Sequence, residues 1–470
     1  MKLHTFFAAV LLQACGLCSL GLCGQIVYPW RATTAIVKAG ESFEVWFNAD
    51  AGQTVSSIIL RGPYSTLTPE MAPPVTGRWV YDESSGNTFN TRIRVTVPAH
   101  SFADRYDLIL KTSSGDEIST GAAKVVRHYK GGYYIMHISD VHRWQGGHDG
   151  VLLLRKVSAI LDIANIIGPE LLFETGDNMY NVVNHPERES SYFHGLPAEG
   201  IKGMHDTSAA TFMVAGNHDT PSNNSAQDKD LAATARFYNR YYGLHAYHFR
   251  YGNGRFMVLN DAWVGFDNSS QSAAAASWLA SVGRGNFRVV AAHIKDARLD
   301  KIREATDPDL ILAGHTHHSA NGNPHPSPGR ARQYIASAVR EPQYFEFNLF
   351  RVDGETGNFE AVGGPSARVP VIENPTRESI ANPASWVPML QLSFARENQG
   401  GSSSNTATLT NKYDFPLTGA RVRFVMKKGS YAVTAGLIEQ TLENDSVSVL
   451  DVSVDLPPRS TTTVSIGPRP

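Results

Sequence analysis

The alternation of apolar and polar residues divides the chain into a β-rich beginning, a mixed middle and a β-rich end. In residues 25–127, Phe43, Val45 and Phe47 alternate with Glu44 and Trp46, and residues 92–97 repeat the pattern. Alternation with a period of two predicts half-buried antiparallel strands. Because further short strands lie between turns rich in Gly, Pro and Ser, this segment predicts an immunoglobulin-like β-sandwich.

The middle of the chain alternates long apolar strands with helical patterns. Strand 133–139 and strand 171–174 flank a helix that Asp149 can cap and Gly168-Pro169 can end. Its apolar stripe consists of Leu153, Val157, Ile160, Leu161 and Ala164. Further strands are expected at 211–215, 255–259, 287–292 and 310–313, helices at 231–242 and 273–282, and a hairpin turn at 252–254. Residues 128–364 therefore predict an α/β (α+β) core, a two-sheet αββα sandwich with helices outside.

Prolines mark the end of this core. Residues 365–389 contain Pro365, Pro370, Pro375, Pro383 and Pro388. Proline sustains neither a helix interior nor a central strand, so this segment is expected to be a linker. Alternation returns in residues 390–470, where Val422, Phe424 and Met426 alternate with charged neighbours. This end of the chain predicts a second immunoglobulin-like sandwich.

The first residues have the pattern of a secretory signal. Lys2 and His4 precede an apolar run from Phe6 to Cys23. Cleavage after residue 24 would remove all 3 cysteines of the sequence and leave no thiolate for disulfides or metals. We therefore expect a secreted or periplasmic protein. Lipobox-like strings that end at Cys15 and Cys23 keep a lipid anchor as an alternative, and no later stretch approaches the about 20 apolar residues of a membrane span.

The net charge of the sequence argues against a nucleic-acid-binding protein. The sequence has 42 Lys+Arg and 44 Asp+Glu, a formal net charge of −2. It thus offers no polycationic surface of the kind that binds nucleic acid.

Candidate chemistry lies at the downstream ends of the apolar strands of the middle region. The strings are Asp140-x-His142, Gly176-Asp177-Asn178, Gly216-Asn217-His218-Asp219, His293 and Gly314-His315-x-His317. Each one alone is explained as well by a turn, a cap or a surface histidine. Together they offer ligands at the carboxyl ends of strands, where open α/β sheets place their sites. Residues two apart on extended backbone point to the same side, so Asp140 with His142, and His315 with His317, are expected to converge.

The types of ligand narrow the choice of metal ion. Carboxylates, imidazoles and an amide oxygen without thiolates suit Mn, Fe, Zn or Co. We expect two divalent transition metal ions in one site.

These strings resemble the signature of the calcineurin-like metallophosphoesterases, which runs DxH, GD, GNH[DE], a lone His and GHxH. The resemblance implies that Asp140, His142 and His317 hold one metal, Asp177 bridges, and Asn217, His293 and His315 hold the second. It also implies that His218 is a general acid outside the ligand set. A β-sandwich before the catalytic domain is similar to the arrangement in purple acid phosphatases. Those enzymes lack a histidine at position 142, so His142 rather than Tyr180 is expected to ligate.

The same site supplies the charge that phosphoester hydrolysis needs. Two divalent ions bring about +4, the two aspartates about −2 and a bridging hydroxide about −1, leaving roughly +1 to meet a phosphoryl group. The hydroxide would attack, His218 would protonate the leaving oxygen, and Asp219 would orient His218. Asn178, His318 and Arg143 adjoin the ligands and are weaker candidates for substrate contact. No sequence motif of a serine hydrolase, a P-loop or a dinucleotide site is present.

The sequence thus predicts a secreted phosphomonoesterase or phosphodiesterase that acts on a small molecule or a head group. The choice between these substrates is assigned to loops 180–208 and 321–330, where His185, His194 and His205 lie in the first loop. An alternative of another class is a non-catalytic binding protein that uses its sandwiches around a vestigial scaffold. The sandwiches could also dock the enzyme to a glycan or another surface.

Overall fold

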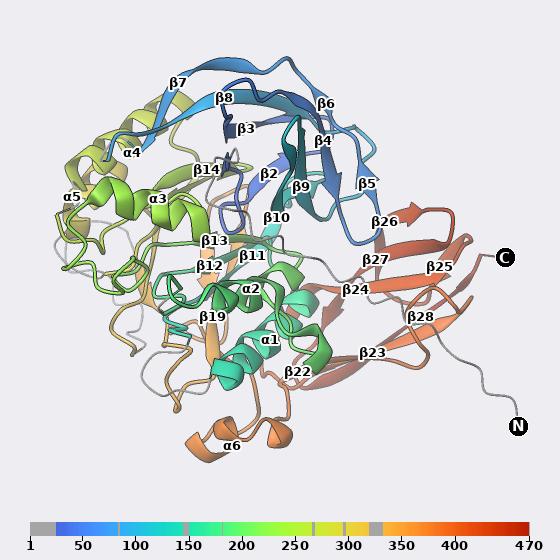
Figure 1. Ribbon diagram of the computed structural model, residues 1–470. Helices are drawn as coiled ribbons and strands as arrows, with labels where there is room; N and C mark the ends of the chain where they lie inside the picture. The colour runs from blue at the N-terminus through green and yellow to red at the C-terminus, as the bar shows by residue number, and fades with distance from the viewer. Residues whose placement is uncertain are drawn as a thin grey trace, which may run out of the picture.

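The computed structural model describes residues 25–82, 85–143, 150–180, 182–265, 268–294, 298–318 and 332–469. The predicted signal segment, Asp149 and loop 321–330 lie outside these residues. Within them the chain forms β-rich regions at both ends and a mixed region between them (Figure 1).

The N-terminal region is a sandwich of two sheets. One sheet has the order β1-β3-β8-β6, with β7 also on β8, and the other has the order β2-β10-β9-β4-β5. The strands are β1 (Gln25–Tyr28), β2 (Ala35–Lys38), β3 (Ser42–Asn48), β4 (Val55–Arg61), β5 (Thr66–Leu67), β6 (Glu70–Met71), β7 (Val75–Asp82), β8 (Asn87–Thr96), β9 (Arg105–Thr112) and β10 (Gly115–Val126). The predicted alternation is confirmed in β3, where Val45 and Phe47 are buried and Val45 pairs with Ile93 of β8.

The middle region contains two mixed sheets. The first has the order β13-β12-β11-β19-β20, with β21 also on β19, and the second has the order β14-β15-β16-β17-β18. The strands are β11 (Gly132–Ile138), β12 (Leu171–Glu174), β13 (Ala210–Met213), β14 (Tyr247–Tyr251), β15 (Gly254–Val258), β16 (Phe287–Ala291), β17 (Leu310–Ala313), β18 (Arg332–Ile335), β19 (Glu346–Asp353), β20 (Phe359–Ala361) and β21 (Arg368–Pro370). The helices are α1 (Gly150–Ile167), α2 (Pro186–His194), α3 (Leu231–Tyr241), α4 (Asn268–Val282) and α5 (Arg298–Thr306), with 3-10 turns at Pro197–Glu199 and Met204–Asp206.

The predicted strands and the 252–254 hairpin are confirmed to within one or two residues, whereas α2, α5 and β18 to β21 were not predicted.

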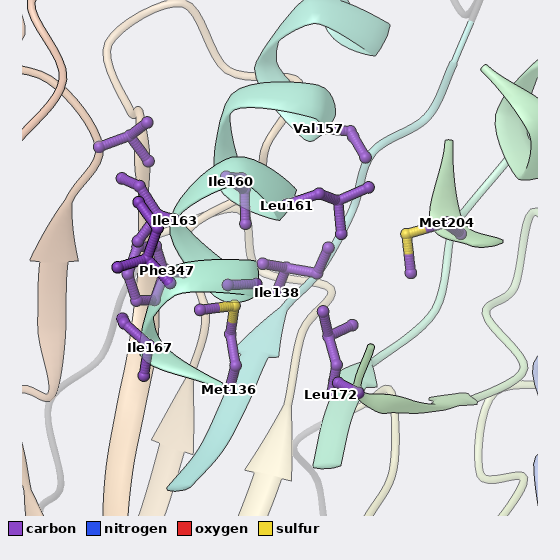
Figure 2. Packing of buried hydrophobic residues seen from close by; sticks show 14 of the residues in the cluster. Met136, Ile138, Val157, Ile160, Leu161, Ile163, Ile167, Leu172, Met204 and Phe347 are labelled. Atoms are coloured by element: carbon purple, nitrogen blue, oxygen red, sulfur yellow. The ribbon is translucent and has the colours of Figure 1, made fainter. Parts of the chain in front are cut away.

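Strand β11 shows how the layers form, because its residues are buried on both faces. Ile135 packs with Phe173, Phe256 and other residues between the two sheets. Met136 and Ile138 point the other way and pack against α1 (Figure 2). On the far side, α4 and α5 cover the second sheet through Leu279 and Ile302. The order is helix, sheet, sheet, helix, as the αββα prediction requires.

The prediction that residues 365–389 form a linker is wrong in part. β21 pairs with β19 and buries Val369, and α6 (Arg377–Ala381) follows, with a 3-10 turn at Pro383–Ser385. Thr376 caps α6 by accepting a hydrogen bond from the Ser379 backbone N–H. The prolines lie at the ends of these short elements or between them, where proline is tolerated. Val369, Val371, Ile372 and Ile380 belong to the main buried cluster, so the segment is part of the packed core.

The C-terminal region is a second two-sheet sandwich. Its strands are β22 (Leu390–Phe394), β23 (Asn405–Asn411), β24 (Leu417–Lys427), β25 (Tyr431–Val433), β26 (Leu437–Glu443), β27 (Val447–Leu456) and β28 (Ser460–Pro468). The sheet orders are β22-β23-β28-β25 and β24-β27-β26. Relative to the constant-type immunoglobulin order, the fifth and seventh strands are exchanged. For both ends of the chain the sandwich is therefore present, whereas the immunoglobulin-like assignment stays a prediction.

The C-terminal sandwich shares a core with the middle region. Leu161 and Ile163 of α1 belong to one buried cluster with Val422 and Phe424 of β24. Figure 1 shows α1 beside the strands of this sandwich. Since α1 is apolar on more than one side, it needs a second layer over the face that the first sheet does not cover.

The two sandwiches also contact each other directly. Arg423 of β24 donates to Asp104 at 2.7 Å and to Asp451 at 2.7 and 2.9 Å. The side chains of Asp104 and Asp451 are only 5% and 7% exposed. Gln440 adds hydrogen bonds to the backbone N–H and C=O of Ala103.

Replacing Arg423 tests this contact. We expect Arg423→Ala to destabilise the fold by about 3–5 kcal/mol, because it leaves the buried Asp104 carboxylate without its cation, whereas Asp451 keeps Arg421 at 3.0 Å. Thermal unfolding followed by calorimetry is the measurement, and Arg396→Ala, which removes an exposed arginine of the same sandwich, is the control. Equal unfolding temperatures for the two variants would show that the sandwiches are not coupled through Arg423.

Candidate metal centre

The predicted ligands lie at the carboxyl ends of strands from both sheets. Asp140 and His142 follow β11, Asp177 follows β12 and Asn217 follows β13, all in the first sheet. His293 follows β16, and His315 and His317 follow β17, in the second sheet. The site therefore depends on the packing of one sheet on the other.

The pairs Asp140/His142 and His315/His317 converge on left-handed backbone. The expected extended backbone is wrong, because φ is +52° and +43° at Asp140 and His142, and +69° and +60° at His315 and His317. Left-handed backbone at a non-glycine residue is uncommon and is tolerated where the surroundings hold it, as at functional sites.

The side chains form overlapping groups, each with ligand atoms within 4.8 Å of one another. One group is Asp140, His142 and His317; a second is Asp177, His293 and His315; a third is His142, Asp177 and His218. Asn217 joins the second group, with its Oδ1 3.1 Å from His293 Nε2. The structure thus brings all the predicted metal residues together.

The Asp140 carboxylate is held by one oxygen and leaves the other without a partner. Oδ2 accepts hydrogen bonds from Ser139 Oγ at 2.6 Å and from the His315 backbone N–H at 2.9 Å. Oδ1 is buried and has no hydrogen bond in the described residues. The close approach requires Gly314, because a Cβ there would lie 2.6 Å from Asp140 Oδ2 and 2.0 Å from Ser139 Oγ.

The Asp177 carboxylate lies between the groups. Its Oδ1 accepts from the His218 backbone N–H at 2.9 Å, while Oδ2 lies 3.3 Å from His142 Nε2 and 3.2 Å from His293 Nε2. One oxygen is thus shared by histidines of two groups, which is the position of a bridging ligand.

Electrostatics keep both carboxylates ionised. Burial raises the pKa of Asp140, but the neighbouring imidazoles of His142 and His317 outweigh it and hold the pKa well below its usual range. Burial likewise raises the pKa of Asp177, and the His293 charge and hydrogen bond lower it to about 2. Asp177 in turn outweighs the effect of burial on His293 and raises the pKa of that imidazole to about 10.

This donor set fits divalent metal ions. Asp140 Oδ1 is a buried acceptor without a donor, and the Nε2 atoms of His142 and His317 face each other at 3.2 Å. Two imidazole nitrogens that point at one space beside an orphan carboxylate oxygen suit a shared cation.

The comparisons with known proteins identify this region. Residues 133–319 match the family model of calcineurin-like phosphoesterases. The chain contains a calcineurin-like phosphoesterase domain. This family uses divalent metals, in agreement with the donor set.

Similar solved structures include a purple acid phosphatase from yellow lupin seeds (Lupinus luteus), with 12% identity, a TM-score of 0.42, and 68% of this chain and 69% of that chain covered. A dimetal phosphatase from Danio rerio is similar at 13% identity and a TM-score of 0.31, with 46% and 92% covered. No curated protein matches the sequence. Among the described residues, no helix is both long enough and apolar enough to span a membrane.

His218 lies at the edge of the phosphoesterase site. Its Nδ1 is 2.6 Å from the Asn223 carbonyl oxygen, which can only accept, so Nδ1 carries a proton. The other nitrogen, Nε2, is therefore the one that can exchange a proton with a substrate. The ring packs 5.2 Å from that of His142 and 6.1 Å from that of Tyr180, which makes Tyr180 a wall of the site.

The prediction that Asp219 orients His218 is wrong. Asp219 Oδ2 accepts from the backbone N–H groups of Asp177 and Gly216 at 2.9 Å and from Asn178 Nδ2 at 3.0 Å. Its Oδ1 accepts from the Asn178 N–H at 2.9 Å. Burial and the Asp177 charge raise the pKa of Asp219 to about 7, although the backbone N–H groups lower it. Asp219 is thus a buried anchor between two ligand loops, and the Asn223 carbonyl orients His218.

Two of the weaker substrate candidates are buried and hydrogen-bonded to other parts of the protein. Asn178 is fully buried, and its amide donates to Asp219. Arg143 is 2% exposed, and its guanidinium donates to Arg188 O and Ser191 Oγ of α2. Both side chains are held by contacts with segments distant in sequence, and such contacts cannot be predicted from the sequence. His318 is exposed, with Nδ1 3.2 Å from the Tyr344 hydroxyl, and stays a candidate.

The histidines of the 180–208 insertion are not members of the metal groups. His194 and His205 instead line a cavity of about 1080 Å³ between the N-terminal sandwich, α1 and the C-terminal sandwich.

Two carboxylates that contact the ligand histidines were not predicted from the sequence. Asp261 accepts hydrogen bonds from the backbone N–H of His293 at 2.9 Å. Glu341 Oε1 lies 3.1 Å from His317 Nδ1. Asp261 follows β15 and could have been found by the strand-end rule, whereas Glu341 follows an apolar run with no motif around it.

Substituting Asp219 separates an anchoring role from a catalytic one. We expect Asp219→Asn to lose about 1–3 kcal/mol of stability. The backbone N–H groups that donate to the carboxylate in the native protein would face the NH2 group of the asparagine, which cannot accept. Thermal unfolding is the measurement, with Asp445→Asn on an exposed loop as the control. Unchanged stability together with lost turnover would instead support the predicted catalytic role.

Proposed function

We propose that this protein hydrolyses phosphoesters at a dinuclear metal site in its calcineurin-like domain. The observation that carries the proposal is the position of Asp177, one oxygen of which lies within 3.3 Å of His142 Nε2 and 3.2 Å of His293 Nε2. A carboxylate shared in this way joins two ligand groups into one site.

The residues divide into the two halves of that site. Asp140, His142 and His317 would hold one divalent ion, Asp177 would bridge, and Asn217, His293 and His315 would hold the other. When bound, two such ions supply Lewis-acid chemistry, which activates water and neutralises charge on a phosphoryl group. Mn, Fe, Zn and Co all suit these ligands.

His218 would act as the general acid. Because Asn223 O fixes the proton on Nδ1, the imidazolium can give the proton on Nε2 to the leaving oxygen. The ring contacts with His142 and Tyr180 hold its orientation. No covalent nucleophile is needed.

The substrate would be a phosphomonoester or phosphodiester of a small molecule or head group. Export is part of the proposal, because residues 1–24 have the pattern of a secretory signal.

Removing the shared carboxylate tests the metal site. The wild-type protein should bind about two equivalents of Mn²⁺ or Zn²⁺, whereas Asp177→Ala should retain less than about one and lose turnover. Metal content by mass spectrometry and release of 4-nitrophenol from the mono- and bis-ester phosphates are the measurements. Asp445→Ala, an exposed residue of the C-terminal sandwich, is the control. Wild-type turnover in Asp177→Ala would refute the proposal, and wild-type protein without metal would favour a non-catalytic binding protein.

Replacing His218 tests the general acid separately. We expect His218→Asn to keep its metals and to lose about 10²–10⁴-fold in kcat on alkyl phosphates, whose leaving group needs a proton. The loss on 4-nitrophenyl esters should be much smaller, because 4-nitrophenolate leaves without protonation. His128→Asn, an exposed histidine, is the control. Equal losses on both substrates would assign His218 to another role.

A further inference from the structure

The loop between β18 and β19 runs along the metal centre, although no predicted site residue lies in it. Ala338 bridges to Ser139, and the backbone N–H groups of Val339 and Arg340 donate to the carbonyls of Ser139 and Asp140 at 3.0 and 3.1 Å. This loop is thus tied to the segment that carries Asp140 and His142.

The loop delivers a carboxylate to a ligand histidine. Glu341 Oε1 lies 3.1 Å from His317 Nδ1, and the two side chains are 21% and 26% exposed. On the other side of the same ring, Nε2 lies 3.4 Å from Asp140 Oδ1. Because a carboxylate accepts, Glu341 places the ring proton on Nδ1 and leaves the Nε2 lone pair toward Asp140 and the metal position.

The two halves of the site differ in this outer contact. His293 Nδ1 lies 2.6 Å from the Thr175 carbonyl oxygen, which is neutral. His142 Nδ1 is buried and has no partner in the described residues. A charged acceptor makes an imidazole a stronger ligand than a neutral one does.

A buried lysine fixes the loop from behind. Lys156 of α1 is 2% exposed, and its ammonium donates to the carbonyls of Val339, Glu341 and Tyr344, the last two at 3.0 and 2.7 Å. The three ammonium protons of Lys156 thus have three carbonyl acceptors, all in the loop between β18 and β19. Burial lowers the pKa of Lys156 to about 7, although the charges of Glu341 and Glu346 raise it.

We propose that Glu341 is a positioning residue that strengthens His317 as a ligand, so that the Asp140/His142/His317 half binds its ion more tightly than the other half. Lys156 acts through Glu341 by holding its loop. This inference rests on the proposed dinuclear function.

Stepwise metal titration of the full-length protein tests the inference. Metal-free protein is titrated with Zn²⁺ against a competing chelator, and Co²⁺ spectra report each ion separately. We expect Glu341→Ala to weaken the tighter of the two binding steps by about 10–100-fold and to leave the weaker step unchanged. Glu341→Gln, which keeps the oxygen acceptor but not the charge, should lie between wild type and Glu341→Ala.

Controls separate positioning from a general loss of charge or stability. Glu355→Gln removes an exposed acid near the opposite end of the first sheet, where Asp353 pairs with Gly132, and should change neither step. Lys156→Met should weaken the same step as Glu341→Ala, and the double variant should be no weaker than Glu341→Ala alone, because the residues share one route. If Lys156→Met does not fold, the Glu341 variants still decide the inference.

The failures are distinguishable. A wild-type protein that binds no metal would overturn the proposed function itself. A different case is a wild type that binds two ions while Glu341→Ala binds both as tightly as Glu355→Gln does, or while Glu341→Ala weakens both steps by the same factor. Either result would overturn only the role of Glu341.

Discussion

Buried negative charge is the constraint on which this site depends. Asp140 and Asp177 are 0% and 2% exposed, and Asp219 beside them is 1% exposed. Burying carboxylates costs several kcal/mol each unless charges and hydrogen bonds compensate. The protein supplies backbone N–H groups to one oxygen of each ligand aspartate and histidine nitrogens to the other. Both oxygens of Asp219 accept hydrogen bonds, yet burial and the Asp177 charge still raise its pKa to about 7. Asp140 Oδ1 has no hydrogen bond in the described residues, so an acceptor remains open at the metal position.

The scaffold makes this arrangement rigid by joining parts distant in sequence. Glycine at 314 lets a loop of the second sheet approach Asp140 of the first sheet, as no residue with a Cβ could. Helix α1 packs under the first sheet and also against β24 of the C-terminal sandwich. The same helix carries Lys156, which holds the loop of Glu341. The C-terminal sandwich therefore supports the outer contacts of the site, and its separation from the phosphoesterase domain as an independent module would expose the apolar face of α1.

The sequence predicted the parts that depend on local patterns. Apolar runs located the central strands, and polar strings at their ends located Asp140, Asp177, His293 and the other ligands. Both signals lie in contiguous residues, so they can be read without knowing how distant segments pack. It did not predict contacts between segments, such as Asp219 with the 177–178 backbone or Arg143 with α2, since these depend on how loops pack. Proline spacing also misled, because β21 and α6 are short enough to fit between prolines.

Burial divides the site into an enclosed part and a more exposed rim. Asp140, His142, Asp177 and His293 are buried, whereas Asn217 and His218 are half-buried and His315 and His318 are exposed. The second group therefore lines the solvent-facing side of the site. In the proposed function, the buried residues would hold charge and metal for any phosphoryl group, so they would discriminate little between the alcohols attached to it. Under the same proposal, discrimination among substrates would come from side chains at the rim, such as Tyr180 beside His218 and the pair His318 and Tyr344. Because these side chains lie on loops, they can vary without disturbing the buried charge balance beneath them.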